Sequence, residues 1–297
     1  MLLALLLLGH SRVPNTVGRI GSFLETFLPW LGLPIPVLLG LALLRRAPVA
    51  LLAPLLPVAA WLDHFGAALV PAPDSGYDLT AVQHNVSDEN ADPAGTAQAL
   101  RAVRADVVAL EELTPAALPT YAEILGTDLA HHAVHGTVGL WSRFPLTEVR
   151  PPPIRPAGFG ADWNRGLRVT ARTPRGDLAV YVVHLPSVRL GPGGLRSAAR
   201  NESATLLGAA VAAEPVTRVL LLGDLNGTVE DRGLAPVTSR LPSTGPPFAF
   251  SWPAALPVAR IDQVLSRAAT VTALWTLPAT GSDHLPVAAR VRLTDTP

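Results

Sequence analysis

The segment Val219-Leu220-Leu221-Leu222-Gly223-Asp224-Leu225-Asn226 is the most informative stretch of this sequence. Its apolar run is typical of a buried strand, and the strand leads through a glycine into a carboxylate and an amide. Because side chains alternate along an extended chain, Asp224 and Asn226 are predicted to point to the same side. Such a pair can position a water molecule and donate to a phosphate oxygen. Gly-Asp and Asn-Gly also form turns, so the segment alone fits a turn equally well.

A second polar pair, Asp283-His284, directly precedes the last predicted strand, 286–293. A histidine can take up a proton near neutral pH, and a carboxylate can hold a hard cation. Asp262 lies inside another predicted strand, 260–265, where a buried acid needs a partner. His284 is a candidate for that partner, with Asp262 fixing the tautomer of the imidazole.

Three further predicted strands end in polar residues. Asn85 ends one strand, His184 ends another, and Glu111 and Glu112 follow a third. Alternation allows only one of the two glutamates to point into the same site. Each of these residues alone fits a structural role. Together they favour a metal-phosphate site, because open α/β folds bind ligands at the ends of their strands.

Beyond residue 73, short apolar strands alternate with a few helical stretches. Residues 96–104 have helical spacing between the strands 79–85 and 106–110, which predicts a β–helix–β unit. A longer helix fits residues 194–213. Many strands with few helices favour α/β layers around two sheets. Further strands are predicted at 137–141, 167–173, 178–184, 218–222, 260–265, 270–276 and 286–293.

The amino-terminal region is apolar and almost free of charge. Residues 27–44 are uncharged, Arg45 and Arg46 follow, and residues 47–62 are uncharged again. These stretches approach the roughly 20 residues that a transmembrane helix needs. Their prolines argue against soluble helices, since membrane helices tolerate proline better. Arginines favour the cytoplasmic side, so we expect the Arg45-Arg46 turn inside and the chain after residue 62 outside.

Two other interpretations of this region remain open. Residues 1–10 fit the apolar part of a signal peptide, although they lack a basic start and leave the later apolar block unexplained. The apolar stretches also fit buried helices of a soluble core. A multi-pass anchor accounts for both blocks. We therefore expect residues 1–72 to form membrane-anchoring helices in the cell membrane and residues 73–297 to form a catalytic domain.

Composition and charge narrow the function. The 297-residue chain has 23 basic and 23 acidic residues and no cysteine. The lack of cysteine excludes zinc-thiolate sites and thiol nucleophiles. Binding to DNA usually requires a basic surface that releases counterions from the phosphates. A formal net charge of zero therefore disfavours nucleic acid as a partner, without excluding it.

The strand-end segments, in this order, resemble the motifs of the endonuclease/exonuclease/phosphatase superfamily, which includes DNase I-like nucleases, sphingomyelinases and inositol phosphatases. The resemblance extends from about residue 79 to residue 291. It implies a four-layer α/β sandwich of two packed mixed sheets flanked by helices, here preceded by N-terminal transmembrane helices. The matching segments are Asn85, Glu111-Glu112, Ser142-Arg143-Phe144-Pro145, His184-Leu185, Gly223 to Asn226, Ile261-Asp262 and Ser282 to His284.

The resemblance implies a metal site. Glu112 would be the main metal ligand, with Asn85 and Asp283 close to the metal or the phosphate. Mg²⁺ suits such an oxygen-rich site, and Mn²⁺ is the alternative. Glu111 departs from the family pattern, which has glutamine at this position, and adds a negative charge beside the metal ligand.

The resemblance also implies catalytic roles. His284, paired with Asp262, would be the general base or the phosphate-side catalytic histidine. Asp224 would orient the attacking water. Asn226 and His184 would donate hydrogen bonds to the phosphoryl oxygens.

The layout resembles membrane-anchored actinobacterial members linked to teicoplanin resistance, in which apolar spans precede a phosphoesterase domain. We therefore expect hydrolysis of a phosphodiester or pyrophosphate bond at the outer face of the membrane. The substrate would be a phosphorylated small molecule or, preferably, a cell-envelope lipid. Because fold alone does not fix the substrate, two alternatives stay open. They are a membrane-anchored extracellular nuclease and a non-catalytic binding module with the same fold.

Overall fold

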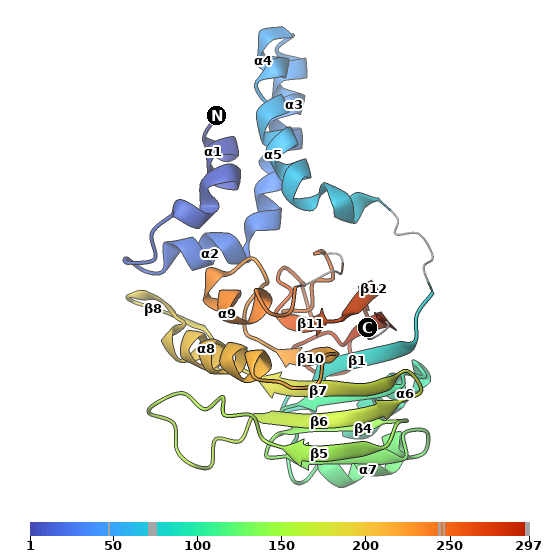
Figure 1. Ribbon diagram of the computed structural model, residues 1–297. Helices are drawn as coiled ribbons and strands as arrows, with labels where there is room; N and C mark the ends of the chain where they lie inside the picture. The colour runs from blue at the N-terminus through green and yellow to red at the C-terminus, as the bar shows by residue number, and fades with distance from the viewer. Residues whose placement is uncertain (47, 71–75, 243–244, 246, 295–297) are drawn as a thin grey trace.

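Two β-sheets dominate the protein, whose computed structural model describes residues 1–46, 48–70, 76–242, 245 and 247–294 (Figure 1). The strands are β1 (Leu79–Asn85), β2 (Val107–Glu111), β3 (His131–His135), β4 (Val138–Ser142), β5 (Leu146–Arg150), β6 (Gly166–Thr173), β7 (Gly176–His184), β8 (Arg189–Gly191), β9 (Gly194–Arg196), β10 (Val219–Asp224), β11 (Asp262–Arg267), β12 (Ala269–Thr276) and β13 (Val287–Leu293). The helices between them are α6 (Pro93–Ala102), α7 (Leu118–Gly126), α8 (Ala198–Ala212), η4 (Arg232–Leu234) and α9 (Ala235–Thr238).

Both large sheets are mixed, as the sequence predicts. The first has six strands in the order β12-β13-β1-β2-β4-β3, and the second has five in the order β11-β10-β7-β6-β5. Strand β1 runs parallel to β2 and antiparallel to β13. Strand β10 likewise runs parallel to β7 and antiparallel to β11. The carboxyl ends of these parallel pairs carry four of the predicted strand-end residues, Asn85, Glu111, His184 and Asp224.

Alternating side chains of the strands build three apolar layers. In β2, Ala109 belongs to the core between the two sheets, whereas Val108 and Leu110 face the opposite side. On that side they pack with Leu100 of α6 and Tyr121 of α7. Helices α8 and α9 cover the second sheet in the same way (Figure 1). The expected arrangement of two mixed sheets flanked by helices is confirmed.

The sequence pattern did not predict two outer strands and misplaced the start of one helix. Strands β3 and β5 are outer strands with half-buried and exposed side chains, so they lack a clear apolar alternation. The helix expected at 194–213 begins only at Ala198, because residues 194–196 form β9. Arg200 of this helix is buried in an ion pair with Asp231.

The amino-terminal segment forms helices that project from the sheets (Figure 1). One helix, Val49–Leu69, is long and apolar enough to cross a membrane, and only 22% of its apolar window is buried. Helices Ile20–Thr26 and Leu28–Leu44 would make a second span together, but they are bent by 74°. The elements are α1 (Leu2–Gly9), η1 (His10–Arg12), α2 (Ile20–Thr26), η2 (Leu28–Gly32), α3 (Pro34–Leu44), α4 (Pro48–Leu52), α5 (Leu55–Phe65) and η3 (Gly66–Leu69).

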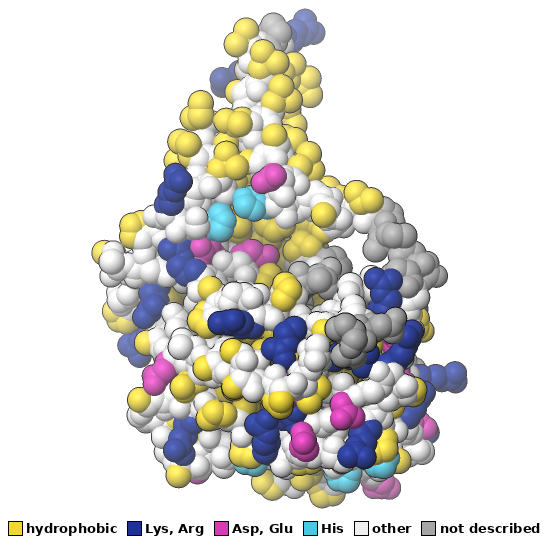
Figure 2. All heavy atoms as spheres, in the orientation of Figure 1, with side chains coloured by type: hydrophobic (Ala, Val, Ile, Leu, Met, Phe, Trp, Pro, Cys, Tyr) yellow, Lys and Arg dark blue, Asp and Glu magenta, His cyan; other side chains and the backbone are white. Residues whose placement is uncertain are grey.

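Hydrophobic side chains cover much of this projection (Figure 2). Most of the exposed large hydrophobic side chains of the protein precede residue 71. A run of exposed apolar side chains of this kind marks a surface made for a membrane or a partner. The boundary expected at residues 72/73 and the start of the span 47–62 lie outside the described residues.

Several contacts join the projection to the sheets. Glu25 of α2 is buried and receives a bidentate pair of hydrogen bonds from Arg232, with Nε and Nη2 at 2.8–3.1 Å. The indole Nε1 of Trp30 donates to the carbonyl oxygen of Val258 at 2.7 Å. The amide of Leu195 in β9 donates to a carbonyl of the segment before α2. The helices are therefore attached to the rest of the chain through buried contacts.

Candidate active site

Strand register brings three of the selected residues into one row. Strand β10 lies between β7 and β11, and its register pairs Asp224 with His184 on one side and with Asp262 on the other. All three side chains are almost fully buried. The preceding Gly223 has no room for a side chain, because a Cβ there would collide with the carbonyl oxygen of Val183. The close approach of β10 to β7 thus explains the glycine before the aspartate.

Asp262 holds His284 in place. The Nδ1 of His284 lies 2.8 Å from Oδ2 of Asp262, as expected from the sequence. The same oxygen accepts a hydrogen bond from the Ser251 hydroxyl at 2.5 Å, and Oδ1 accepts one from Gln83 Nε2 at 3.0 Å. Polar atoms of Asp224, Asp262 and His284 lie within 4.8 Å of one another, as in a metal site. Since both oxygens of Asp262 are already engaged, we assign it to orienting the imidazole.

Asp224 is the centre of the site. Its Oδ2 lies 3.6 Å from Nε2 of His184 and 3.8 Å from Nε2 of His284. The same oxygen accepts hydrogen bonds at 3.2 Å from the side-chain amides of Asn85 and Asn226. Its Oδ1 accepts from the backbone amide of Asn226 at 2.8 Å. The two side chains thus meet as predicted, but through a turn and not through strand alternation, because β10 ends at Asp224 and Asn226 has a left-handed backbone.

The two asparagines bond mainly within the protein. Asn226 donates a further hydrogen bond to the carbonyl oxygen of Leu185 at 3.0 Å, and its backbone has a left-handed φ of 49°. Both hydrogens of its amide are thus used, although the resemblance assigns to it a bond to phosphate. The Oδ1 of Asn85 accepts from the amide of Ser87 at 3.1 Å. Both side chains fix the position of the Asp224 carboxylate.

The two glutamates after β2 lie at different depths. Glu112 is partly exposed, and its Oε1 lies 3.8 Å from Nε2 of His184. Its left-handed φ of 59° is uncommon for a residue with a side chain and is typical of functional positions. Glu111 is fully buried and accepts a hydrogen bond from Gln83 Nε2 at 2.8 Å. Glu112 therefore lies at the mouth of the site and Glu111 beneath it.

Asp283 lies at the rim. Its side chain is 65% exposed, and Oδ1 is 4.0 Å from Nε2 of His284. The loop that carries it is fixed by Ser282, whose hydroxyl donates to the carbonyl oxygen of Asn85 at 2.7 Å. The Ser282 oxygen also accepts from the amide of His284 at 3.1 Å. This loop thus ties the residues before β13 to the end of β1.

Three functional neighbours were missed by sequence reasoning: Ser251, Gln83 and Arg165. Ser251 comes from a loop, and Gln83 faces the site from the middle of a strand. Arg165 precedes β6, and its Nη1 lies 3.4 Å from both ring nitrogens of His184. It also lines an adjacent cavity of about 510 Å³. Since each is isolated along the chain, only the contact pattern of the folded protein reveals these residues.

Burial and neighbouring charges shift the pKa values of the site residues in different directions, so these residues differ in protonation state. Burial alone would lower the pKa of His284, but the adjacent Asp262 and Asp224 carboxylates raise it to about 10. Burial raises the pKa of Asp224 to about 7, opposed by the attraction of His284. Burial opposes ionisation of Asp262, yet the charge and hydrogen bond of His284 hold its pKa below the usual value. At neutral pH, His284 is an imidazolium between two acids of different strength.

His184 and Glu111 are shifted toward their neutral forms. Burial and the nearby positive charge of Arg165 lower the pKa of His184 to about 3. A neutral His184 can donate one hydrogen bond or accept one, according to its tautomer. Burial and the negative charge of Asp262 raise the pKa of Glu111 well above its usual value. Protonated Glu111 resembles the glutamine that the family pattern has at this position.

The donor set fits a hard divalent cation. Glu112, Asp283 and Asp224 each place a carboxylate oxygen within 4.0 Å of a histidine nitrogen of the site. Burial of the Asp224 carboxylate costs free energy, as its raised pKa indicates, and a nearby cation would offset that cost. Oxygen ligands on a partly open rim are what Mg²⁺ and Mn²⁺ require.

Comparison with family models identifies the domain. A model described as the Endonuclease/Exonuclease/phosphatase family matches residues 82–284. The chain belongs to this family. The matched range includes every residue of the site from Asn85 to His284. A search of the curated proteins finds no match to this family member.

Solved structures share the fold of this family member at low sequence identity. Sphingomyelinase C from Streptomyces griseocarneus is 21% identical, with a TM-score of 0.55 over 71% of this chain and 98% of that one. A mannosyl-6-phosphatase from Bacteroides thetaiotaomicron is 16% identical, with a TM-score of 0.58 over 72% and 99%. A Staphylococcus aureus beta toxin with bound magnesium ions is also 16% identical, with a TM-score of 0.55 over 72% and 99%. At these identities the similarity is one of fold.

Proposed function

We propose that this protein is a divalent-metal-dependent phosphoesterase. The observation that best supports this proposal is the contact of one buried carboxylate, Asp224, with two histidines in opposite protonation states. Enzymes that cleave esters need a proton acceptor for water and a positive group for the charge that develops on the reacting centre. A purely structural polar cluster has no need for either. Membership of the family agrees with this assignment.

In this proposal, Glu112 and Asp283 at the rim would hold the cation together with the buried Asn85. When bound, Mg²⁺ or Mn²⁺ would neutralise negative charge on the phosphate as it reacts. Asp224 orients the attacking water and accepts its proton, for which a pKa of about 7 is suitable. His284, held by Asp262, donates from its imidazolium to a phosphoryl oxygen. His184 donates to another oxygen of the same group, with Asn226 supporting Asp224.

Hydrolysis of bis-p-nitrophenyl phosphate tests the chemistry. We expect Mg²⁺-dependent release of p-nitrophenol by the full chain and its loss on addition of a chelator. Glu112→Ala and His284→Ala should each lower kcat/KM by about 10²-fold or more. Glu123→Ala and His132→Ala are matched controls, because both residues are exposed and lie away from the site. Activity that survives chelation or either site substitution would count against the proposal, and absence of activity in the unmodified protein would favour a binding module.

The substrate proposal is a phosphodiester or pyrophosphate of a cell-envelope lipid, cleaved at the outer face of the membrane. It is supported by the apolar projection and by the formal net charge of zero, which disfavours nucleic acid as a substrate. The resemblance to membrane-anchored actinobacterial proteins supports it as well. Similar folds include one protein named for a sphingolipid and one named for a sugar phosphate. Arg45 and Arg46 lie between two apolar stretches and would stay on the cytoplasmic side of the membrane. The catalytic part, which follows the second stretch, would then lie on the outer side.

A competition between substrates tests this part of the proposal. The full chain would be offered vesicles that contain a polyprenyl pyrophosphate or sphingomyelin, and separately plasmid DNA. We expect hydrolysis in the vesicles and little cleavage of DNA. Ready cleavage of DNA with both lipids intact would instead identify a membrane-anchored nuclease.

A further inference from the structure

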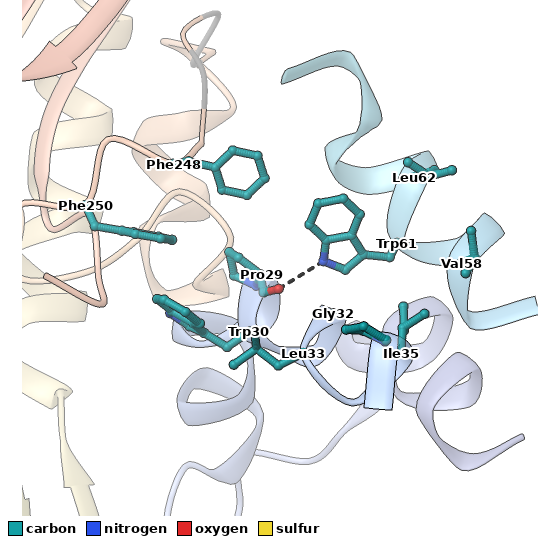
Figure 3. Close-up of a pocket in the computed structure, with 11 residues that line it drawn as sticks. Pro29, Trp30, Gly32, Leu33, Ile35, Val58, Trp61, Leu62, Phe248 and Phe250 are labelled. Atoms are coloured by element: carbon teal, nitrogen blue, oxygen red, sulfur yellow. Dashed lines mark hydrogen bonds between the residues drawn. The ribbon is translucent and has the colours of Figure 1, made fainter. Parts of the chain in front are cut away.

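An apolar cavity lies between the helical projection and the catalytic part. Its volume is about 390 Å³, within the range of ligand pockets. Trp30 of η2, Trp61 of α5 and the rings of Phe248 and Phe250 line it (Figure 3). The remaining lining residues are also apolar or glycine: Pro29, Gly32, Leu33, Ile35, Pro36, Val58 and Leu62.

The chemistry of the lining indicates an apolar occupant. The indole Nε1 of Trp61 donates to the carbonyl oxygen of Pro29 at 2.9 Å (Figure 3). The indole Nε1 of Trp30 donates to the carbonyl oxygen of Val258 at 2.7 Å. Both polar atoms of the tryptophans are thus satisfied within the protein. What faces the cavity is ring surface and aliphatic side chain, which offers contact area but no hydrogen bond. Such a lining favours hydrocarbon and disfavours water or a polar group.

Stacked rings make the cavity wall firm. Trp30 and Phe250 stack with their centroids 5.2 Å apart, and Trp61 and Phe248 stack at 5.9 Å. Each pair joins one ring of the projection to one ring of the loop before β11. The cavity is therefore formed by both parts of the chain together, and neither part encloses it alone.

The same loop connects the cavity to the active site. Phe250 lines the cavity, and the next residue, Ser251, donates to Asp262 at 2.5 Å. Adjacent residues are about 3.8 Å apart along the backbone. Asp262 in turn holds His284. One short segment thus has an aromatic ring in the cavity and a hydroxyl group on the catalytic acid–histidine pair.

We propose that this cavity receives the hydrocarbon chain of a lipid phosphate while the phosphate group lies at the catalytic site that contains Asp224 and His284. The inference rests on the proposed phosphoesterase function and specifies its substrate class. The exposed apolar helices place the cavity beside the hydrocarbon region of the membrane from which such a chain would enter. Burial of each methylene group is expected to raise affinity roughly fourfold until the cavity is full.

A chain-length series with one chromogenic leaving group tests the proposal. The probes are p-nitrophenyl alkyl phosphates from ethyl to dodecyl, offered to the full chain in phosphatidylcholine nanodiscs with Mg²⁺. We expect kcat/KM to rise with chain length in the unmodified protein. Val58→Phe fills the cavity from α5 and should lower kcat/KM for the dodecyl ester about tenfold while leaving the ethyl ester within about twofold.

Val49→Phe is the matched control. It makes the same substitution on α4 of the projection, at a residue that is exposed and does not line the cavity. Long esters partition into the bilayer equally in both variants, so partitioning cannot produce a difference between them. If Val58→Phe and Val49→Phe show the same chain-length profile as the unmodified protein, the hydrocarbon does not enter this cavity and the inference is wrong.

A binding measurement separates failure of this inference from failure of the proposed function. Addition of 12-bromododecyl phosphate should quench the fluorescence of Trp30 and Trp61 in a saturable way, and Val58→Phe should weaken this quenching about tenfold. Saturable quenching without hydrolysis of any ester would refute the phosphoesterase and retain a hydrocarbon site. Hydrolysis with quenching that is unaffected by Val58→Phe would retain the phosphoesterase and refute the cavity as its lipid site.

Discussion

At the scale of single residues, the most unusual feature of the site is the buried acid Glu111. It has no exposure and one hydrogen bond, from Gln83, and burial raises its pKa well above the usual value. An acid whose pKa is raised by folding binds its proton more tightly in the folded state. Stability therefore falls as pH rises from the unfolded pKa toward the folded one. Glu111 costs stability at neutral pH unless its charge is removed.

Glu111→Gln should accordingly stabilise the protein. Glutamine keeps an oxygen for Gln83 and never has to be protonated. In the presence of a chelator, the thermal midpoint should rise by a few degrees, and by more at about pH 8 than at about pH 5. Glu111→Ala leaves the Gln83 amide with only its hydrogen bond to Asp262 and should lower stability by about 1–3 kcal/mol. A lower midpoint for Glu111→Gln at the higher pH would show that the carboxylate is ionised and needed.

The Asp262–His284 pair gives a second prediction at this scale. The Asp262 carboxylate helps to raise the pKa of His284 to about 10, so the imidazolium persists across neutral pH. Asp262→Asn removes that attraction and lets His284 lose its proton at lower pH. We expect kcat to fall about 10²-fold or more, and the alkaline limb of the kcat/KM profile to move to lower pH. An alkaline limb that stays in place would show that activity does not depend on this protonation.

How far the sequence could reveal these residues depends on their spacing along the chain. Asp224, Asp262 and His284 could be found because each follows or begins an apolar strand. The sequence also indicated the Asp262–His284 contact, since a buried acid needs a partner. Ser251 and Arg165 could not be found, because a lone serine or arginine in a loop carries no periodic signal. Their roles arise only when the register of β7, β10 and β11 brings the loops together.

At the scale of helices and strands, a buried ion pair attaches α8 to the second sheet. Arg168 of β6 is fully buried, and its Nη2 lies 2.5 Å from Oε1 of Glu214, just after α8. Tyr181 of β7 donates to the other oxygen of Glu214 at 2.8 Å. Burial opposes ionisation of Glu214, but these partners hold its pKa below the usual value. The ionised Glu214 thus stabilises the protein at pH values above the pKa of this group in the unfolded chain. This stabilisation is lost as the pH falls through its pKa in the folded protein.

Glu214→Ala should therefore destabilise the protein strongly. It removes the buried partner of Arg168 and leaves only the exposed Glu148 as an ion-pair partner. Loss of one partner of a buried pair typically costs about 3–5 kcal/mol and should lower the thermal midpoint by about 10 °C. The difference from the unmodified protein should shrink in acid, where the glutamate is protonated in both states. Asp128→Ala is the control, since Asp128 forms an exposed pair with Arg101 and its loss should leave the midpoint nearly unchanged. Equal effects of the two substitutions would contradict the assignment.

Strands could be predicted from the sequence where their side chains are regularly buried. Strand β1 has the predicted bounds Leu79–Asn85, and most other interior strands lie within two residues of their expected ends. The outer strands β3 and β5 were not predicted, because their side chains are only half-buried or exposed. The β8–β9 hairpin was not predicted, because the residues of β9 fit the helical spacing of the residues that follow them. Local pattern thus predicts strands with buried side chains, including the outer strand β11, but not strands as exposed as β3 and β5.

At the scale of the whole molecule, the projection and the catalytic part are physically coupled. Glu25 and Trp30 bind residues of the loops that flank the site, and the aromatic cavity lies at the same junction. The sequence indicated an anchor followed by a catalytic domain but gave no sign of this junction, since the two sets of residues are about two hundred positions apart. Membrane insertion of the projection would therefore also set the orientation of the site relative to the bilayer.

That orientation can be measured, because the chain contains no cysteine. Arg46→Cys places a thiol at the exposed turn between α3 and α4, and Asp177→Cys places one at the exposed start of β7. If arginines keep the turn on the cytoplasmic side, a membrane-impermeant maleimide should label Asp177→Cys in intact cells and label Arg46→Cys only after the membrane is opened. The reverse pattern would place the site in the cytoplasm and remove the outer-face lipid as substrate. Labelling of both in intact cells would show that the two apolar stretches do not cross the membrane as a hairpin.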